Sequence, residues 1–159
     1  MGEVNVIVRR PGERPIEKVI ASGVGTTCLG NLRALKLASG SLAAGDINAF
    51  ALAWQNPEPV SIIVLAVVID ITIAGGAAGV LDVGTAANAT THSDNLLDGI
   101  THNAIDKVTN LYETDAGTNG RPIQVMDAKD GATDYITAQI LTAAAASLAG
   151  SYYILYTEV

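Results

Sequence analysis

Two histidines and one cysteine are the residues of this chain best suited to acid–base or nucleophilic chemistry. Nucleophilic catalysis needs a serine or cysteine beside a histidine base that a carboxylate orients. His92 and His102 lie in a polar loop and at its margin, no Gly-x-Ser-x-Gly element occurs, and Cys28 lies in a Gly- and Thr-rich stretch without a local signature. We therefore expect no catalytic triad, no cofactor and no enzymatic activity.

Residues 90–95, with Asp98 and His102 nearby, are the best candidates for metal binding, because they offer two imidazole nitrogens and several oxygens. Zinc prefers a tighter set of ligands, and the Asp-x-Asp-x-Asp-Gly loop typical of calcium sites does not occur. The alternative is that the Asp and Asn side chains of this segment bond their own backbone in a turn. The loop 127–134 is similar and contains an Asp-Gly turn signal. We favour turns in both loops and expect no bound metal.

Other binding chemistries have weaker support in the sequence. Gly23-Val24-Gly25 and Gly75-Gly76 do not open a helix with a Lys-Ser/Thr end, so neither predicts a phosphate loop. A sugar site would need exposed aromatic rings, but Trp54 alternates with Phe50 and Leu52 and is expected in the core. A glycan-binding jelly-roll module therefore stays an alternative only.

The charge of the chain is divided between its two ends. Residues 1–36 hold six Lys and Arg against three Glu, a net +3, whereas the other 123 residues hold three Lys and Arg against thirteen Asp and Glu, a net −10. The basic part has no aromatic residue and the body is acidic, so we expect no nucleic-acid partner. Only 16% of the residues are charged, which is low for a globular chain and is typical both of subunits covered by neighbours and of secreted β-proteins.

The sequence predicts no membrane anchor and no disulfide framework. The apolar run 62–69 is eight residues long, far below the roughly 20 needed to cross a bilayer, and it is expected to form a buried strand. The first residues lack the pattern of a secretory signal, and Cys28 alone cannot form an intramolecular disulfide. Either the protein matures in a reducing cell interior, or it is stable without crosslinks.

Alternating apolar residues predict an all-β protein. Val4, Val6 and Val8 predict a first strand that ends at Pro11-Gly12, and residues 10–45 are expected to form an arm, although 29–37 would suit a short helix. In residues 61–73, the first half is apolar on both faces, as in a strand packed on two sides, and Ile69, Ile71 and Ile73 are expected to point inward. The further strand candidates are 50–54, 80–83, 96–100, 108–112, 123–128, 135–141 and 151–159. Many short strands between Gly-, Asn- and Asp-rich turns indicate an antiparallel sandwich or barrel. We expect a strand and arm over 1–45 and a β-sandwich domain over 46–159.

Several strand and turn segments of the body carry a resemblance to a known group of proteins. They are Phe50-Ala-Leu-Ala-Trp54-Gln-Asn-Pro57, Val67-Val-Ile-Asp-Ile-Thr72 with Gly75-Gly76, Val80-Leu-Asp-Val-Gly84, Ser93-Asp-Asn-Leu96 with Asp98-Gly99, Asp134-Tyr-Ile136, and Leu148-Ala-Gly150 with Tyr152-Tyr153. Over about two-thirds of its length the chain resembles the small β-sandwich structural proteins of tailed-bacteriophage virions, which are head decoration (cement) or fibre-type proteins. No reactive motif is part of this resemblance.

The resemblance implies a jelly-roll-like sandwich, commonly trimeric, on the surface of a capsid. The implied partners are the major capsid protein and identical subunits in a homotrimer, with no membrane contact. An N-terminal strand can add to the edge of a neighbouring sheet through main-chain hydrogen bonds. The residues expected to bind a partner in this way are Val4, Val6, Val8, Arg9, Arg10 and Arg14. A tail, neck or baseplate module is the alternative position on the particle.

Overall fold

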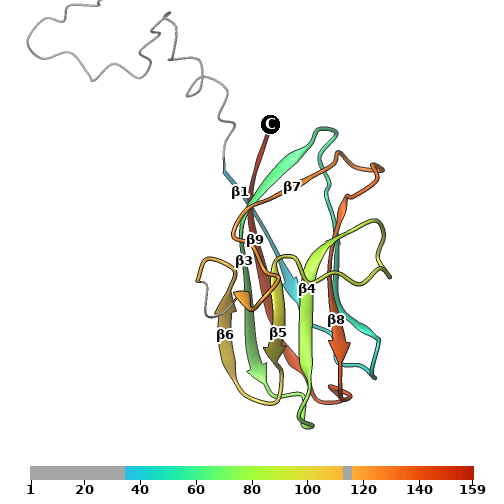
Figure 1. Cartoon of the computed structure of the whole chain (residues 1–159), viewed down its shortest axis with the longest axis vertical. Helices are drawn as coiled ribbons and strands as arrows, with labels where there is room; N and C mark the ends of the chain where they lie inside the picture. The colour runs from blue at the N-terminus through green and yellow to red at the C-terminus, as the bar shows by residue number, and fades with distance from the viewer. Residues whose placement is uncertain (1–34, 113–115) are drawn as a thin grey trace, which may run out of the picture. The chain divides into compact units, whose positions relative to one another are not determined.

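The computed structural model describes residues 35–112 and 116–159, and in these residues nine strands form two antiparallel sheets (Figure 1). The predicted strand over Val4–Val8 and most of the predicted arm lie outside the described residues. The strands are β1 (Lys36–Ser41), β2 (Phe50–Gln55), β3 (Ile62–Ile73), β4 (Val80–Ala86), β5 (Leu97–Thr101), β6 (Asp106–Thr109), β7 (Gln124–Met126), β8 (Tyr135–Leu141) and β9 (Ala149–Glu158).

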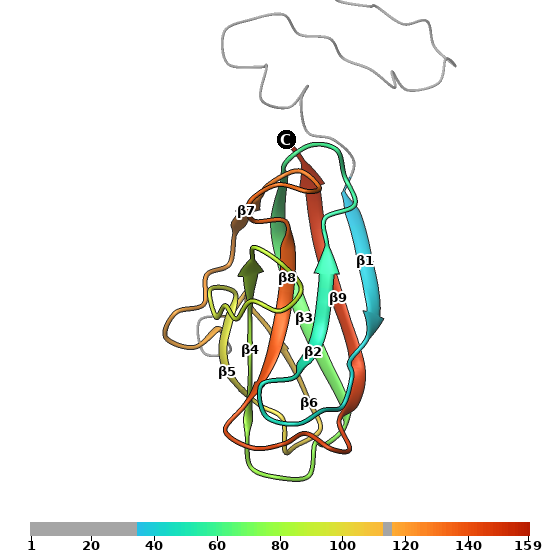
Figure 2. The same ribbon diagram turned by 90° about the vertical axis from the view of Figure 1, so that its right-hand side faces the viewer.

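The two sheets are packed as separate layers (Figure 2). One has the order β1-β9-β3-β6, with the short β7 also paired to β3, and the other has the order β2-β8-β4-β5. If β7 is left aside, the first strand pairs with the last, the second with the next to last, β3 with β6, and β4 with β5. Such nested antiparallel pairs make the jelly-roll form of the β-sandwich. The predicted fold class is therefore confirmed for the described residues.

The core lies between the sheets, and β3 contributes much of it. Ile62, Val64, Val67, Ile69 and Ile71 are fully buried. The regular alternation is interrupted between Val64 and Ala66, where the register with β9 shifts, so that inward positions change from even to odd numbers. The prediction that Ile73 points inward was wrong: its side chain is 55% exposed, since a second register shift follows Ile71 at the end of the strand.

The last strand, predicted over 151–159, has one face on the core. Tyr152, Ile154 and Tyr156 face the core, whereas Tyr153 is exposed on the opposite side. The ring of Trp54 packs against Tyr156 with 5.4 Å between the ring centroids, and Trp54 is half-buried against the core as predicted.

The first described strand lies in a region that was predicted to be arm. Residues 36–41 pair with Tyr156 to Ser151 of β9 without a register shift, so this stretch belongs to the sandwich and is neither arm nor helix. Its small residues suit this place: a Cβ on Gly40 would lie only 2.6 Å from the hydroxyl oxygen of Tyr152. Within the described residues, the sandwich therefore begins before residue 46.

One side chain fills a gap in the pairing of β3. On one edge, β3 pairs with β7 at residues 62–64 and with β6 at residues 68–71. Between these pairings, the amide of Val67 donates to Asn110 Oδ1 at 2.7 Å, and Asn110 Nδ2 donates to the carbonyls of Arg121 (3.1 Å) and Pro122 (2.8 Å). The side chain of Asn110 thus bonds β3 where no strand pairs with it, and it does so inside the protein, because Asn110 is only 1% exposed.

Candidate interaction surface

The outside of the sheet formed by β1, β9 and β3 is unusually apolar. The register places Leu37 opposite Leu155, Ile63 opposite Val125, and Val68 opposite Tyr153. We call these six side chains the outer face. Leu37 is 65% exposed, Val125 is 63% exposed and Tyr153 is 37% exposed, and the other three are half-buried. No described residue covers this surface, and contiguous exposed apolar groups of this kind are typical of protein contact sites.

The outer face carries little charge. Asp70 is opposite Lys107 of β6 on the same side of the sheet, and the two are paired with an Nζ–Oδ2 distance of 3.0 Å. The next position across the sheet is Ser151, and then Ser41 of β1. An apolar centre bordered by hydroxyl groups and a paired charge resembles the composition of a protein–protein interface.

The apolar pattern of β3 indicated this surface in the sequence, but we interpreted it as burial of the strand on both sides. The first half of β3 was predicted to be packed on both sides because it is apolar on both faces. In the structure only its inner side meets the opposite sheet, and Ile63 and Val68 are on the outer face. Among the residues that the structure describes, none covers the second apolar side of this strand.

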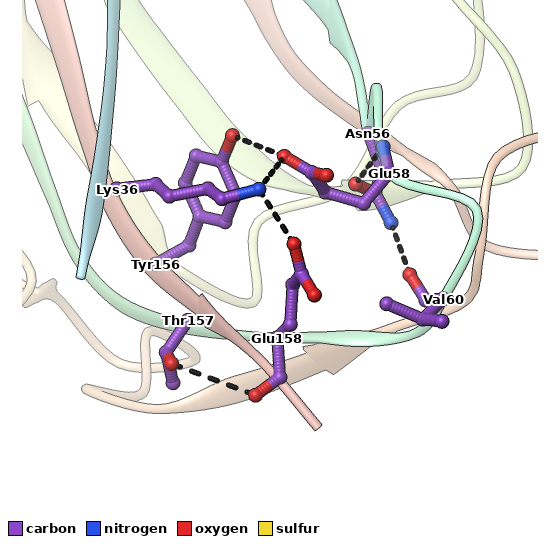
Figure 3. A network of polar contacts seen from close by, with 7 residues as sticks. All are labelled: Lys36, Asn56, Glu58, Val60, Tyr156, Thr157 and Glu158. Carbon is purple, nitrogen blue, oxygen red and sulfur yellow. Dashed lines mark hydrogen bonds and ion pairs between the residues drawn. The ribbon is translucent and has the colours of Figure 1, made fainter. Parts of the chain in front are cut away.

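A polar cluster holds the start of β1 in place (Figure 3). Lys36 Nζ lies 2.5 Å from Glu158 Oε1 and 2.7 Å from Glu58 Oε1, and the hydroxyl of Tyr156 donates to the same Glu58 oxygen at 3.1 Å. The amide of Glu58 in turn donates to Asn56 Oδ1 at 3.0 Å. These contacts join β1, β9 and the β2–β3 loop, so they fix the point at which the preceding chain joins the sandwich.

The cluster changes the acidity of two of its members. Hydrogen bonds to Glu158 and to Glu58 raise the pKa of Lys36, which stays protonated over the physiological range. The pKa of Tyr156 is raised mainly by burial, with a further contribution from its hydrogen bond to Glu58. Burial also raises the pKa of Tyr152. Each of these shifts favours the protonated form of its group.

The loop proposed for metal binding is held by contacts with distant parts of the chain. The turn that we favoured for Asp94 and Asn95 was wrong in its partners, because Asn95 bonds Thr85 of β4 and Asp94 bonds Asn119. The carboxylates Asp94 and Asp98 lie with Asp82 in one group whose oxygens are within 4.8 Å of one another. Asp82 accepts from the amide of Gly99 at 2.8 Å and lies 2.9 Å from His92 Nε2. Asn119 donates to both of the other aspartates. Each of the three carboxylates thus accepts at least one hydrogen bond, and the absence of a metal stays a prediction.

His102, the other histidine of that proposal, lies elsewhere. Its ring is fully buried between Gly75 and Gly79, where an added Cβ would come within 2.5 Å of a ring nitrogen on either side. Nε2 lies 3.3 Å from the carbonyl of Ala143. Among the described residues, the ring of His92 thus contacts a carboxylate and the ring of His102 contacts a main-chain carbonyl, and neither contacts a nucleophile.

In the part of the chain that the structure describes, a search for helices with the length and hydropathy of a membrane span finds none.

The residues predicted to bind a partner lie outside the described residues, so their docking role stays a prediction. They are Val4, Val6, Val8, Arg9, Arg10 and Arg14.

The fold and surface above define a two-sheet antiparallel β-sandwich of jelly-roll type with an apolar outer face. No protein-family model matches the chain, and no curated protein matches it. Among solved structures, the chain is similar to a chain of the cyanophage Pam1 capsid asymmetric unit, with 16% identity and a TM-score of 0.44, over 94% of this chain and 99% of that chain.

Proposed function

We propose that this protein is a virion structural protein without enzymatic activity, a decoration (cement) protein on the capsid surface of a tailed bacteriophage. The observation that carries the proposal is the outer face, an apolar and nearly uncharged surface on a rigid sandwich. A protein that stabilises a shell needs such a surface for its neighbours and needs no reactive centre. The strand and turn segments that resemble phage virion proteins support the same function.

The proposal assigns one partner to the outer face and another to the N-terminal arm. The outer face packs against identical subunits in a homotrimer, and the arm of the basic N-terminal segment binds a neighbouring subunit of the shell, the major capsid protein or another copy. The arm residues are Val4, Val6, Val8, Arg9, Arg10 and Arg14. The opposite net charges of the two parts, +3 for residues 1–36 and −10 for the rest, support separate contact surfaces.

A tail, neck or baseplate module would have the same surface and would differ only in its place on the particle. A glycan-binding module has less support from the site, because Trp54 and Tyr152 are half-buried and pack against the core and do not stand free for a sugar ring.

The test is binding of purified protein to empty heads of the phage that encodes it. We expect the full chain to saturate the heads and a chain without residues 1–20 to bind them far more weakly. Light scattering in solution is expected to give about three times the 16.3 kDa mass of one chain. Unchanged head binding by the truncated chain would contradict the arm, and failure of the full chain to bind heads would contradict the decoration function itself.

A further inference from the structure

Strand β1 differs from the other edge strands of the described residues. Proteins usually protect an edge by making it short, charged or bulged, because its free N–H and C=O groups attract other strands. The edge strand β7 has three residues, β6 has four and begins with Asp106 and Lys107, and the pairings of β2 and β5 with their neighbours contain register shifts. β1 has six residues in unbroken register with β9.

The residues of β1 also leave room for an added strand. Ala38 and Gly40 on its inner side are small, and Leu37, Ser39 and Ser41 on its outer side are exposed. Its one charged residue, Lys36, does not guard the edge, because its amine is held by Glu58 and Glu158. A strand beside β1 would enlarge the outer face, with its own apolar side chains next to Leu37.

The charges near β1 favour one direction for such a strand. The end of the sandwich at which β1 begins includes the β2–β3 loop and the β7–β8 loop, which are joined by a hydrogen bond from the amide of Lys129 to the carbonyl of Glu58. Among the described residues of β1, β9 and these two loops, two lysines stand against five carboxylates: Lys36 and Lys129 against Glu58, Asp127, Asp130, Asp134 and Glu158. At the other end of β1, the loop that follows has one carboxylate, Asp46, and across the sheet Asp70 is two strands away and paired with Lys107. A strand followed by basic residues therefore fits antiparallel to β1.

We propose that the free edge of β1 binds residues 4–8 of a neighbouring copy of this chain, in antiparallel orientation. Their alternating valines extend the outer face, and Arg9 and Arg10, which follow directly, come to lie at the acidic end of the sandwich. This inference rests on the docking arm of the proposed function and names its receptor. A pairing within one chain would leave no segment to dock.

The length of the chain allows this exchange. Residues 9–35 separate the predicted strand from β1, and an extended chain of that length spans up to about 90 Å, at roughly 3.3 Å for each residue. A head-to-tail contact of arm and edge closes into a ring, which agrees with a homotrimer.

The test uses two full-length chains of different tag length, expressed together, both with Cys28→Ser to remove the natural thiol. One carries Val6→Cys and the other carries Ser39→Cys or Ser41→Cys on β1. We expect a disulfide between the chains after mild oxidation, in several-fold higher yield than with Thr101→Cys, an exposed position on the edge strand β5. Arg9→Glu with Arg10→Glu on the arm is expected to lower the yield several-fold.

Equal yields at β1 and at the β5 control position would overturn the proposal. A second experiment uses one chain that carries both Val6→Cys and Ser39→Cys. If its disulfide yield is the same with and without an excess of cysteine-free chain, the arm pairs with β1 of its own chain, and the proposal is wrong. If head binding still depends on residues 1–20 while the β1 disulfide is absent, this inference is wrong and the proposed function stands.

Discussion

Replacing Asn110 by alanine tests the contacts that hold the edge of β3 between β6 and β7. The side chain is 1% exposed and supplies an acceptor to the amide of Val67 and donors to two loop carbonyls. These bonds hold β3 to β6 and to the loop at residues 121–122, where its edge has no other strand. Asn110→Ala removes all of them and leaves the partner groups in place.

The expected cost follows from where those partners lie. Val67 is fully buried, so water does not replace the bond to its amide, and an unsatisfied buried group costs about 1–3 kcal/mol. Arg121 and Pro122 are exposed, so water hydrates their carbonyls and their loss costs about 1 kcal/mol together. We expect the free energy of unfolding to fall by about 3 kcal/mol and the Tm to fall by about 10 °C.

Urea unfolding followed by circular dichroism, at one fixed protein concentration, measures this loss. Asn103→Ala is the matched control, because Asn103 is exposed and its replacement is expected to change stability by less than about 0.5 kcal/mol. If Asn110→Ala costs no more than Asn103→Ala, the side chain does not hold the strands together and the reasoning is refuted.

Three further predictions concern the surface, the polar cluster and the acidic loop. Leu37→Glu places a charge on the outer face and is expected to shift light scattering from the oligomer to the monomer, whereas Thr101→Glu, at an exposed position of the other sheet, is expected to shift it less; equal effects would contradict an apolar contact. Because the pKa of Tyr156 is raised on folding, the unfolded chain loses its phenolic proton first, so stability is expected to fall as pH rises above about 10, and Tyr156→Phe is expected to flatten this fall in thermal melts. Millimolar Ca²⁺ or EDTA is expected to leave the Tm unchanged, and a Ca²⁺-dependent rise that Asp98→Asn abolishes would establish a metal site.

Local patterns in the sequence predicted most of the strands of the sandwich. Period-2 alternation predicted β9 and the second half of the long β3, and β8 was among the strand candidates, because each of these segments has one face on the core and local side-chain order follows it. β1 was missed because its sequence of Lys, Leu, Ala, Ser, Gly and Ser has little intrinsic strand preference. Its conformation depends on β9, more than a hundred residues later in the chain.

The polar cluster and the contacts of Asn110 join residues that are far apart in the sequence, and local sequence patterns do not reveal such contacts. Lys36 meets Glu158 across 122 positions of sequence, and Asn110 meets Val67 across 43. The two-sided apolar pattern of β3 was visible, but one sequence does not tell whether the second side meets another layer of the same chain or a partner. The sandwich topology leaves that side open to a partner, which gives the pattern its meaning for function.

The central claim is that this protein decorates a phage capsid through its sandwich and its arm. Electron cryomicroscopy of intact particles of the phage that encodes it tests this claim most directly. We predict sandwich density on the outer surface of the head, in groups of three, with the outer face between copies and an additional strand beside each β1. A particle with this protein only in the tail, neck or baseplate would contradict the claim, and so would a particle without it.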